Sequence, residues 1–316
     1  MIELKGLTKV FGRGLVGRGL VGHSTGGTRA VDDLTCSIEA GVVTGFLGPN
    51  GAGKTTTMRM ILGLDHPTSG TATIDGKTYR QLPDPLRTVG ALLDAKQVHP
   101  SRSARNHLRW LAATSRVPFT RVDEVLDIVG LAAVADQRAG TLSLGMGQRL
   151  GIAAALLGDP PVLLFDEPVN GLDPEGIRWV RTLMRALAAE GRTVLVSSHL
   201  LAEMANTADR LVVIGRGRLI ASTTVSEFVS RSGADAVRVR SPQLDTLTDL
   251  LAGAGIDVTV EPDGSALAVR GAAIEVVGEL AARNAIVLHE LSITQASLED
   301  AYLRLTDGDV QYRAGR

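Results

Sequence analysis

The segment that most constrains the fold of this chain is a glycine-rich loop between an apolar strand and a helix. Its sequence, Gly48-Pro-Asn-Gly-Ala-Gly-Lys-Thr55, fits the Walker A pattern of a phosphate-binding loop. An apolar run over residues 42–47 precedes it, and helical spacing over residues 54–64 follows. Backbone N–H groups and a helix N-terminus then converge on an anion. The residues expected to contact a nucleotide here are Gly48, Pro49, Asn50, Gly51, Ala52, Gly53, Lys54, Thr55 and Thr56.

Two acidic residues follow a second apolar strand and predict the rest of a nucleotide-hydrolysis site. Residues 162–165 lead directly into Asp166 and Glu167. Adjacent carboxylates on a strand point in opposite directions, so we expect separate roles for them. Asp166 suits coordination of Mg²⁺ together with the Thr55 hydroxyl, and Glu167 suits the base that polarises the attacking water. Lys54 is expected to pair with β- and γ-phosphate oxygens.

A histidine closes a third apolar strand, over residues 193–198. Beside a γ-phosphate, the imidazole of His199 could donate a hydrogen bond and fix the geometry of the water. A purely structural histidine at a strand end is the alternative.

The order of these segments predicts an α/β domain with a parallel sheet over residues 1–225. Apolar strands at residues 42–47, 162–165 and 194–196 alternate with helical spacing at residues 54–64, 122–129, 144–157 and 177–189. The pattern changes near residue 225. Residues 226–316 are predicted to form a second, smaller α+β domain.

The predicted second domain has a strand and helix order typical of a ferredoxin-like fold. Strands are expected at residues 236–240, 256–260, 266–270 and 286–289. Helices are expected at residues 244–251 and 274–283, with a closing helix at 295–305 and a polar tail from 307. Near the other end of the chain, a glycine-rich duplication over residues 12–21 predicts a mobile surface loop. A role of that loop in partner contact or nucleotide gating is the alternative.

Composition limits the class of protein. The formal net charge of the 316 residues is -1, which gives no support to nucleic acid as a partner. Cys36 is the only cysteine, so we expect a buried, inert thiol in a reducing compartment. The N-terminal residues lack the pattern of a signal peptide. The sequence contains no run of about 18 apolar residues, the length that a membrane helix needs, so we expect any membrane role to require a partner.

Four motifs in order resemble the ATP-binding subunits of ABC (ATP-binding cassette) transporters. Beyond the two Walker motifs, residues 142–149, Leu-Ser-Leu-Gly-Met-Gly-Gln-Arg, resemble the ABC signature. Residues 170–173, Asn-Gly-Leu-Asp, resemble the D-loop, and His199 matches the H-loop. The resemblance implies that Ser143, Gly145 and Asp173 contact nucleotide. It also places Phe11 where the family has an aromatic that stacks on adenine, although an ordinary strand-edge residue is the alternative.

The resemblance also implies an architecture and partners. It implies a P-loop cassette with a parallel sheet core and with antiparallel β and α-helical subdomains. Two cassettes, here a homodimer, would hold ATP and Mg²⁺ head to tail, with Ser143 capping a helix that faces the other subunit's nucleotide. A separate membrane permease would dock near residues 99–111, placing the chain peripherally on the cytoplasmic face of the membrane. The C-terminal segment resembles the accessory domain of bacterial drug- and antibiotic-export ATPases, which favours export.

Three departures from the family pattern leave alternatives open. Leu144 and Met146 replace Gly and Gln of the commonest signature, and Asp94 occupies the Q-loop glutamine position, with Gln97 three residues on. Asp94 could reach Mg²⁺ through a water molecule, but its side chain is shorter than that of glutamine. The third departure is the glycine-rich insertion, which separates Phe11 from the next strand. A soluble ABC ATPase acting on ribosomes or DNA, and a regulatory cassette that binds ATP without hydrolysing it, are the alternatives.

Overall fold

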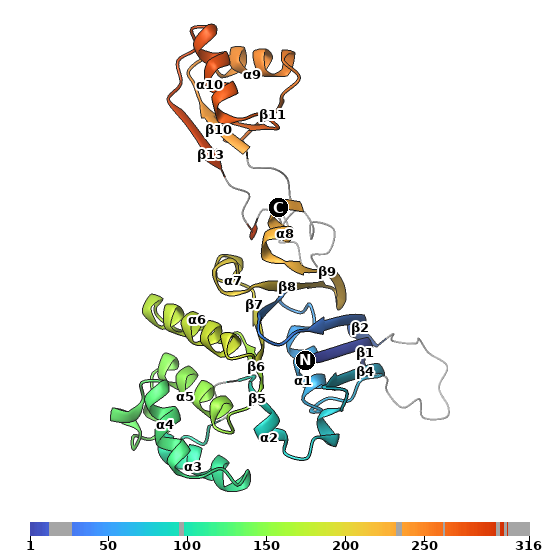
Figure 1. Ribbon diagram of the computed structural model, residues 1–316, viewed down its shortest axis with the longest axis vertical. Coiled ribbons are helices and arrows are strands. Elements are labelled where there is room, and N and C mark those ends of the chain that lie inside the picture. The colour runs from blue at the N-terminus through green and yellow to red at the C-terminus, as the bar shows by residue number, and fades with distance from the viewer. Residues whose placement is uncertain are drawn as a thin grey trace. The chain divides into compact units, whose positions relative to one another are not determined.

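The computed structural model describes residues 1–12, 27–94, 98–231, 236–261, 263–294, 298–299 and 302. Most of the glycine-rich loop, Gln97, the C-terminal tail and most of the predicted closing helix lie outside these residues. Two compact units divide the chain: Met1–Val225 lies in the first and Ser226–Asp307 forms the second. We call them the cassette unit and the accessory unit (Figure 1).

A six-stranded sheet forms the centre of the cassette unit. Its strands, in spatial order, are β5 (Val89–Leu92), β6 (Val162–Asp166), β7 (Thr193–Ser198), β3 (Val43–Leu47), β8 (Arg210–Gly215) and β9 (Arg218–Thr224). Neighbours from β5 to β8 run parallel, and β9 pairs antiparallel with β8. Every residue of β3, β6 and β7 is buried. Both faces of this sheet are therefore covered, which explains why these strands are continuous apolar runs.

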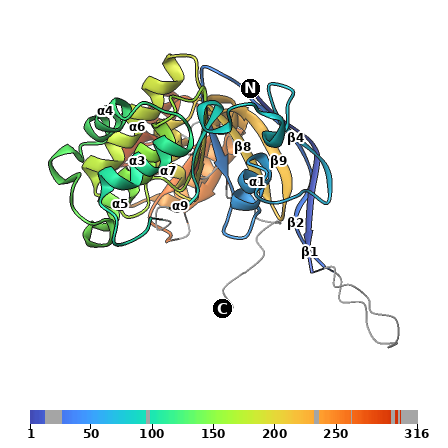
Figure 2. The same ribbon diagram turned by 90° about the horizontal axis from the view of Figure 1, so that it is seen from below.

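Helices cover the two faces of the sheet differently. Figures 1 and 2 show α1 (Lys54–Ile61) on one side of the sheet, and α6 (Pro174–Ala189) with α7 (Leu201–Thr207) on the other. On the α1 side, a three-stranded antiparallel sheet shares the core. Its strands, in spatial order, are β2 (Thr28–Ile38), β1 (Ile2–Phe11) and β4 (Ser69–Ile74). Buried side chains from both sheets and from α1 form one continuous hydrophobic cluster.

A group of helices lies beside the β5 edge of the six-stranded sheet (Figure 1). It consists of α3 (Ala104–Thr114), α4 (Thr120–Ile128) and α5 (Leu144–Leu156), which pack on one another through buried apolar side chains. Short helices connect these parts: η1 (Tyr79–Gln81), α2 (Pro85–Thr88), η2 (Ala132–Val134) and η3 (Ala139–Thr141). The parallel sheet with antiparallel and helical parts confirms the predicted fold class. Within the described residues, no helix is both long enough and apolar enough to cross a bilayer.

The accessory unit is a four-stranded antiparallel sheet with helices. Its elements are α8 (Val225–Arg231), β10 (Ala236–Arg240), α9 (Leu244–Gly253), β11 (Asp257–Val260), β12 (Leu267–Arg270), α10 (Ile274–Arg283) and β13 (Glu290–Thr294). The spatial order β11-β12-β10-β13 is that of a ferredoxin-like sheet. Val237 and Val239 of β10 pack into a core shared with Leu247 and Leu251 of α9. Because strand side chains alternate, Arg238 lies on the other face, where it binds Glu261 and Glu290.

One predicted strand is wrong. Residues 286–289 do not form the last strand, which is β13 and begins at Glu290. Ile286 instead donates its N–H to Ala281 O at the end of α10, at 2.9 Å, and its buried side chain closes the core. The Val287 N–H donates to the Gln243 side chain at 3.1 Å. The apolar run therefore reflects a buried helix-to-strand connection and not a strand.

Candidate functional site

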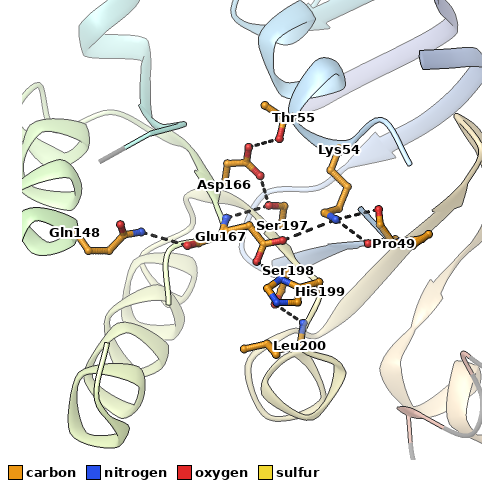
Figure 3. Close-up of polar contacts among 11 residues, drawn as sticks. Pro49, Lys54, Thr55, Gln148, Asp166, Glu167, Ser197, Ser198, His199 and Leu200 are labelled. Atoms are coloured by element: carbon orange, nitrogen blue, oxygen red, sulfur yellow. Dashed lines mark hydrogen bonds and ion pairs between the residues drawn. The ribbon is translucent and has the colours of Figure 1, made fainter. Parts of the chain in front are cut away.

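Three adjacent parallel strands end at the same edge of the six-stranded sheet. β7 lies between β3 and β6, so the glycine-rich loop after β3, the acids at the end of β6 and the histidine after β7 meet there (Figure 3). In open α/β sheets, ligands bind at the carboxyl ends of the strands. The structure therefore brings together Lys54, Thr55, Asp166, Glu167 and His199.

The glycine-rich loop needs its glycines for backbone conformation and for space. Gly51 and Gly53 have φ of 82° and 104°, a region that residues with a side chain rarely adopt. A Cβ on Gly53 would lie 2.4 Å from the carbonyl oxygen of Ala30. Gly53 is also the N-cap of α1, and no side chain caps this helix end. The first N–H groups of α1 are therefore directed at the site without a side-chain acceptor.

The side chain of Lys54 is almost fully buried above the loop. Its Nζ donates to Gly48 O at 2.6 Å and to Pro49 O at 3.4 Å, and it lies 3.8 Å from Glu167 Oε1 (Figure 3). Burial lowers the pKa of Lys54, and the nearby carboxylates of Glu167 and Asp166 oppose that shift. The ammonium is thus held between carbonyl oxygens and a carboxylate, in the position where a phosphate oxygen would be a strong partner.

Asp166 is held by two hydroxyl groups. Thr55 Oγ1 donates to Asp166 Oδ2 at 2.5 Å, and Ser197 Oγ donates to Asp166 Oδ1. A hydroxyl beside a carboxylate is an oxygen donor set that suits Mg²⁺, which takes one or two protein ligands together with phosphate and water. No group of three His, Cys, Asp or Glu side chains in the described part of the chain could form a metal cage. The residues present therefore fit a metal that arrives with its phosphates.

Glu167 leaves the strand in an unusual backbone conformation. Its φ is 51°, in the left-handed region. Its N–H donates to Ser197 Oγ at 3.0 Å and to Ser197 O at 3.3 Å, and its own carbonyl accepts from Gln148 Nε2 at 3.2 Å. The two carboxylates then have different partners: that of Asp166 contacts hydroxyls, whereas that of Glu167 contacts Lys54 and His199. This difference supports separate chemical roles.

The signature and D-loop residues lie at the beginnings of two helices. Ser143 is the N-cap of α5, and its Oγ accepts the Met146 N–H at 3.2 Å. Asp173 is the N-cap of α6, and its Oδ1 accepts the Gly176 N–H at 2.8 Å. Gly145 lies against the D-loop, since a Cβ there would be 3.3 Å from a side-chain carbon of Leu172. The two helix ends are therefore neighbours in the same chain.

Leu144, a departure from the commonest signature, covers part of the D-loop. A Cβ on Gly171 would lie 2.2 Å from Leu144 Cδ2, and Gly171 has a φ of 76°. Any larger residue at position 171 would displace this leucine from its present position. The leucine remains 57% exposed.

Two predicted site residues lie at the margin of this arrangement. Phe11 is the last residue of β1, pairs with Thr28 and is 44% exposed, with Lys9 Nζ 5.1 Å from the ring centroid. Asp94 lies just beyond β5, the strand next to β6. Stacking of Phe11 on adenine and binding of Mg²⁺ by Asp94 remain predictions.

Sequence reasoning missed two residues that hold the site. Ser197 contacts both Asp166 and Glu167, and the only signal for it was its position at the end of an apolar strand, two residues before His199. Gln148 was recognised as part of the signature, but its bond to the backbone of Glu167 had no sequence signal. These residues, with the phosphate loop, define the site of a P-loop nucleotide hydrolase.

Comparisons with known proteins identify the family. Residues 31–170 match the sequence profile of the ABC transporter family, and residues 235–299 match a domain of unknown function (DUF8746). The bacitracin transport ATP-binding protein BcrA of Bacillus licheniformis is 36% identical over 90% of this chain and 94% of its own length. The daunorubicin/doxorubicin resistance ATP-binding protein DrrA of Streptomyces peucetius is 33% identical over 96% and 92%.

Solved structures agree with that comparison. An ATP-binding subunit of an ABC transporter superposes with a TM-score of 0.62 at 26% identity, covering 73% of this chain and 92% of the other. The ATP-binding cassette MJ0796, a dimer bound to ADP and Pi in a post-hydrolysis state, gives a TM-score of 0.62 at 25% identity, covering 71% and 99%. The chain belongs to the ATP-binding proteins of the ABC transporter family and is an ATPase of that family.

Proposed function

We propose that this chain is the ATP-hydrolysing subunit of an exporter whose membrane-spanning permease is a separate polypeptide. The observation that carries the proposal is the convergence of Lys54, Asp166, Glu167 and His199 at one edge of the sheet. This set can bind the phosphates of ATP and polarise a water molecule beside them.

Each residue at that edge has a role that fits its contacts. Lys54 would exchange its carbonyl partners for β- and γ-phosphate oxygens, while the N–H groups of α1 hold the same phosphates. Thr55 and Asp166 would hold Mg²⁺, which supplies charge neutralisation at the phosphate oxygens. Glu167 would orient and polarise the attacking water, and His199 would fix the position of that carboxylate.

The hydrolytic unit is proposed to be a head-to-tail homodimer. The structural relative bound to ADP and Pi is a dimer. In this chain Ser143 and Asp173 begin neighbouring helices, and both lie outside the contacts made by Lys54. A second copy would place the α5 N-terminus of one subunit against the phosphates held by the other, since a helix N-terminus attracts anions.

The permease is proposed to dock in a groove between α2 and the end of α3. An apolar cavity of about 140 Å³ is lined by Leu86, Ala91, Leu111 and Val117, among others. It adjoins a wider hollow of about 530 Å³ that reaches Tyr79 and Arg116; both hollows share Leu86 and Ser115. Leu111 belongs to the stretch that the sequence predicts for docking. A short apolar cytoplasmic segment of a permease fits this lining, and its binding would place the chain on the cytoplasmic face of the membrane.

Export, as opposed to import, is proposed from the named relatives. BcrA is described as a bacitracin transport protein and DrrA as a daunorubicin/doxorubicin resistance protein, and each matches at least 90% of this chain. Both alignments therefore extend well into the accessory unit.

The proposal is tested by purifying tagged Glu167→Gln protein from detergent-solubilised membranes of the native host. Slow hydrolysis should trap the ATP-bound dimer on its permease, and mass spectrometry should find a polytopic membrane protein at about equal ratio. A Leu111→Lys variant should lose that protein, whereas Leu219→Lys, on the far strand β9, should keep it. Ribosomal or DNA-bound partners with an empty membrane fraction would favour a soluble ABC ATPase and overturn the exporter proposal. ATP-bound material with no partner would favour a regulatory cassette.

A further inference from the structure

We propose that Gln148 is a positioning residue for Glu167, through which the signature helix α5 fixes the orientation of the catalytic carboxylate in the same chain. The inference rests on the proposed role of Glu167 as the group that polarises water. Gln148 itself contacts no reacting atom in this proposal and acts only through the backbone of Glu167.

The backbone of Glu167 needs outside support. A residue with a side chain in the left-handed region carries a conformational cost of about 1 kcal/mol or more, and it persists only where its surroundings fix it. At Glu167 the peptide groups on both sides are bonded (Figure 3). The N–H donates to Ser197 of β7, and the carbonyl accepts from Gln148 Nε2 at 3.2 Å.

The two supports differ in where they come from. Ser197 is a residue of the central sheet and pairs directly with Asp166, so it moves with the strand that carries the acids. Gln148 belongs to α5, which packs with α3 and α4 in the helical group. Its side chain is 6% exposed. A buried amide of this kind needs a hydrogen-bond partner, and the partner here is the carbonyl of the catalytic glutamate.

Two neighbouring contacts show that α5 packs against the chain segment that comes after β6. Leu144, one turn before Gln148, lies against Gly171. Arg149, the next residue, places its guanidinium 4.6 Å from the ring centroid of Trp179 on α6. Residues 144 and 148 lie on the same face of a helix. Among these contacts, only that of Gln148 reaches the peptide of Glu167.

The consequence is a mechanical link within one subunit. Ser143 at the start of α5 is proposed to face the nucleotide of the other subunit, and Gln148 lies little more than one turn further along the same rigid helix. A displacement of α5 relative to β6 would pull on the carbonyl of Glu167. The peptide would rotate, and the carboxylate would move relative to Lys54 and His199. Binding of the α5 N-terminus to the nucleotide of the other subunit would then bring the Glu167 carboxylate into the orientation needed for hydrolysis.

The test compares Gln148→Leu with wild type in steady-state ATP hydrolysis. Leucine has a similar volume but cannot donate, so kcat should fall about 10- to 100-fold, as expected for a misplaced catalytic group. The KM for ATP should stay within about twofold, because the phosphate loop is untouched. Gln137→Leu removes an exposed amide from the connection between η2 and η3 and should change neither value. Unchanged kcat in folded Gln148→Leu would overturn the proposal.

A double-mutant comparison separates positioning from a structural role. In single-turnover hydrolysis, adding Gln148→Leu to Glu167→Gln should produce no further loss, because the carboxylate that Gln148 positions is already gone. If Gln148→Leu lowers the rate of Glu167→Gln by the same factor by which it lowers the wild-type rate, Gln148 supports the fold or the dimer instead. If Gln148→Leu fails to fold, Gln148→Met provides a flexible side chain of similar length without the donor. Undiminished hydrolysis by Glu167→Gln alone would refute the proposed role of Glu167 in hydrolysis. It would not refute the hydrogen bond by which Gln148 supports the backbone of Glu167.

Discussion

Nδ1 of His199 lies 2.8 Å from Oε2 of Glu167, joining the end of β7 to the end of β6. The other carboxylate oxygen of Glu167 lies 3.8 Å from Lys54 Nζ. The carboxylate is thus held between an imidazole that follows β7 and an ammonium group on the first residue of α1. The backbone N–H and carbonyl of Glu167 are hydrogen-bonded as well. Contacts to both the backbone and the carboxylate therefore fix the position of this residue.

The contact with His199 predicts a loss of turnover when the imidazole is removed. His199→Ala should lower kcat about 100-fold, the loss expected when a catalytic group such as the Glu167 carboxylate is misplaced. The KM for ATP should change little, since His199 contacts Glu167 and not the phosphate loop. His289→Ala, an exposed histidine of the accessory unit, serves as the control in the same phosphate-release assay. A wild-type rate in His199→Ala would show that the imidazole has only a structural role.

Removal of the ammonium group of Lys54 should weaken nucleotide binding itself. Hydrogen bonds to charged groups contribute about 1.5–3 kcal/mol each, so the Kd for ATP should rise at least about tenfold in Lys54→Ala. Titration with a fluorescent nucleotide measures this directly. Lys77→Ala removes an exposed lysine and should bind as wild type does. Equal affinity in the two variants would contradict the assigned phosphate site.

The capping role of Asp173 can be separated from any contact with nucleotide. Asp173→Ala should lower the free energy of unfolding by about 0.5–2 kcal/mol, because the Gly176 N–H loses its acceptor. Asp173→Asn should lower it far less, since asparagine caps helices as well as aspartate does. Urea unfolding followed by tryptophan fluorescence suits this comparison, because Trp179 lies on the same helix. If both variants also lose ATPase activity, the charge of Asp173 is needed at the site.

The thiol of Cys36 should resist alkylation in the folded protein. Burial raises the pKa of Cys36 from 9.0 to about 12, and the thiolate is the reactive form. Cys36 is partly buried against the hydrophobic core and not fully buried as the sequence predicts. At pH 8 the thiolate fraction should therefore be much smaller than in the unfolded chain. Iodoacetamide labelling with and without denaturant, followed by mass spectrometry, gives the ratio of rates. Labelling at equal rates would mean that β2 exposes this side chain.

Two paired residues of the accessory unit should differ sharply in their effect on stability. Leu267 and Val260 face each other across β12 and β11, but Leu267 is fully buried and Val260 is 52% exposed. Leu267→Ala should destabilise the unit by about 2–5 kcal/mol, whereas Val260→Ala should change stability by less than about 0.5 kcal/mol. Hydrogen exchange of residues 236–294 reports on this unit separately. Similar exchange in the two variants would contradict the assigned core.

The sequence predicted the cassette sheet well because its strands carry a strong signal. Buried parallel strands such as β6 and β7 are uninterrupted apolar runs, and the acids and the histidine at their ends mark where each strand stops. The phosphate loop was equally clear, since its glycines meet a backbone requirement that few other residues can meet. The structure confirms that β6 ends at Asp166, directly before Glu167.

What the sequence could not provide depends on contacts between distant segments. The left-handed backbone of Glu167 is stabilised by Ser197 and Gln148, which lie 30 residues after it and 19 residues before it. No local pattern encodes such a contact. In the accessory unit the wrong strand at residues 286–289 has a related cause: Ile286 is apolar because it fills a core assembled from other elements.

The pairing of β1 with β2 extends as far as Phe11 and Thr28. The ladder itself thus brings the two ends of the intervening segment together, and the sheet does not depend on how many residues connect them. Each doubling of such a connection costs only about 0.6 kcal/mol in closure entropy. We therefore expect that a fluorescent tag or an affinity peptide inserted between Phe11 and Thr28 would leave the cassette fold intact.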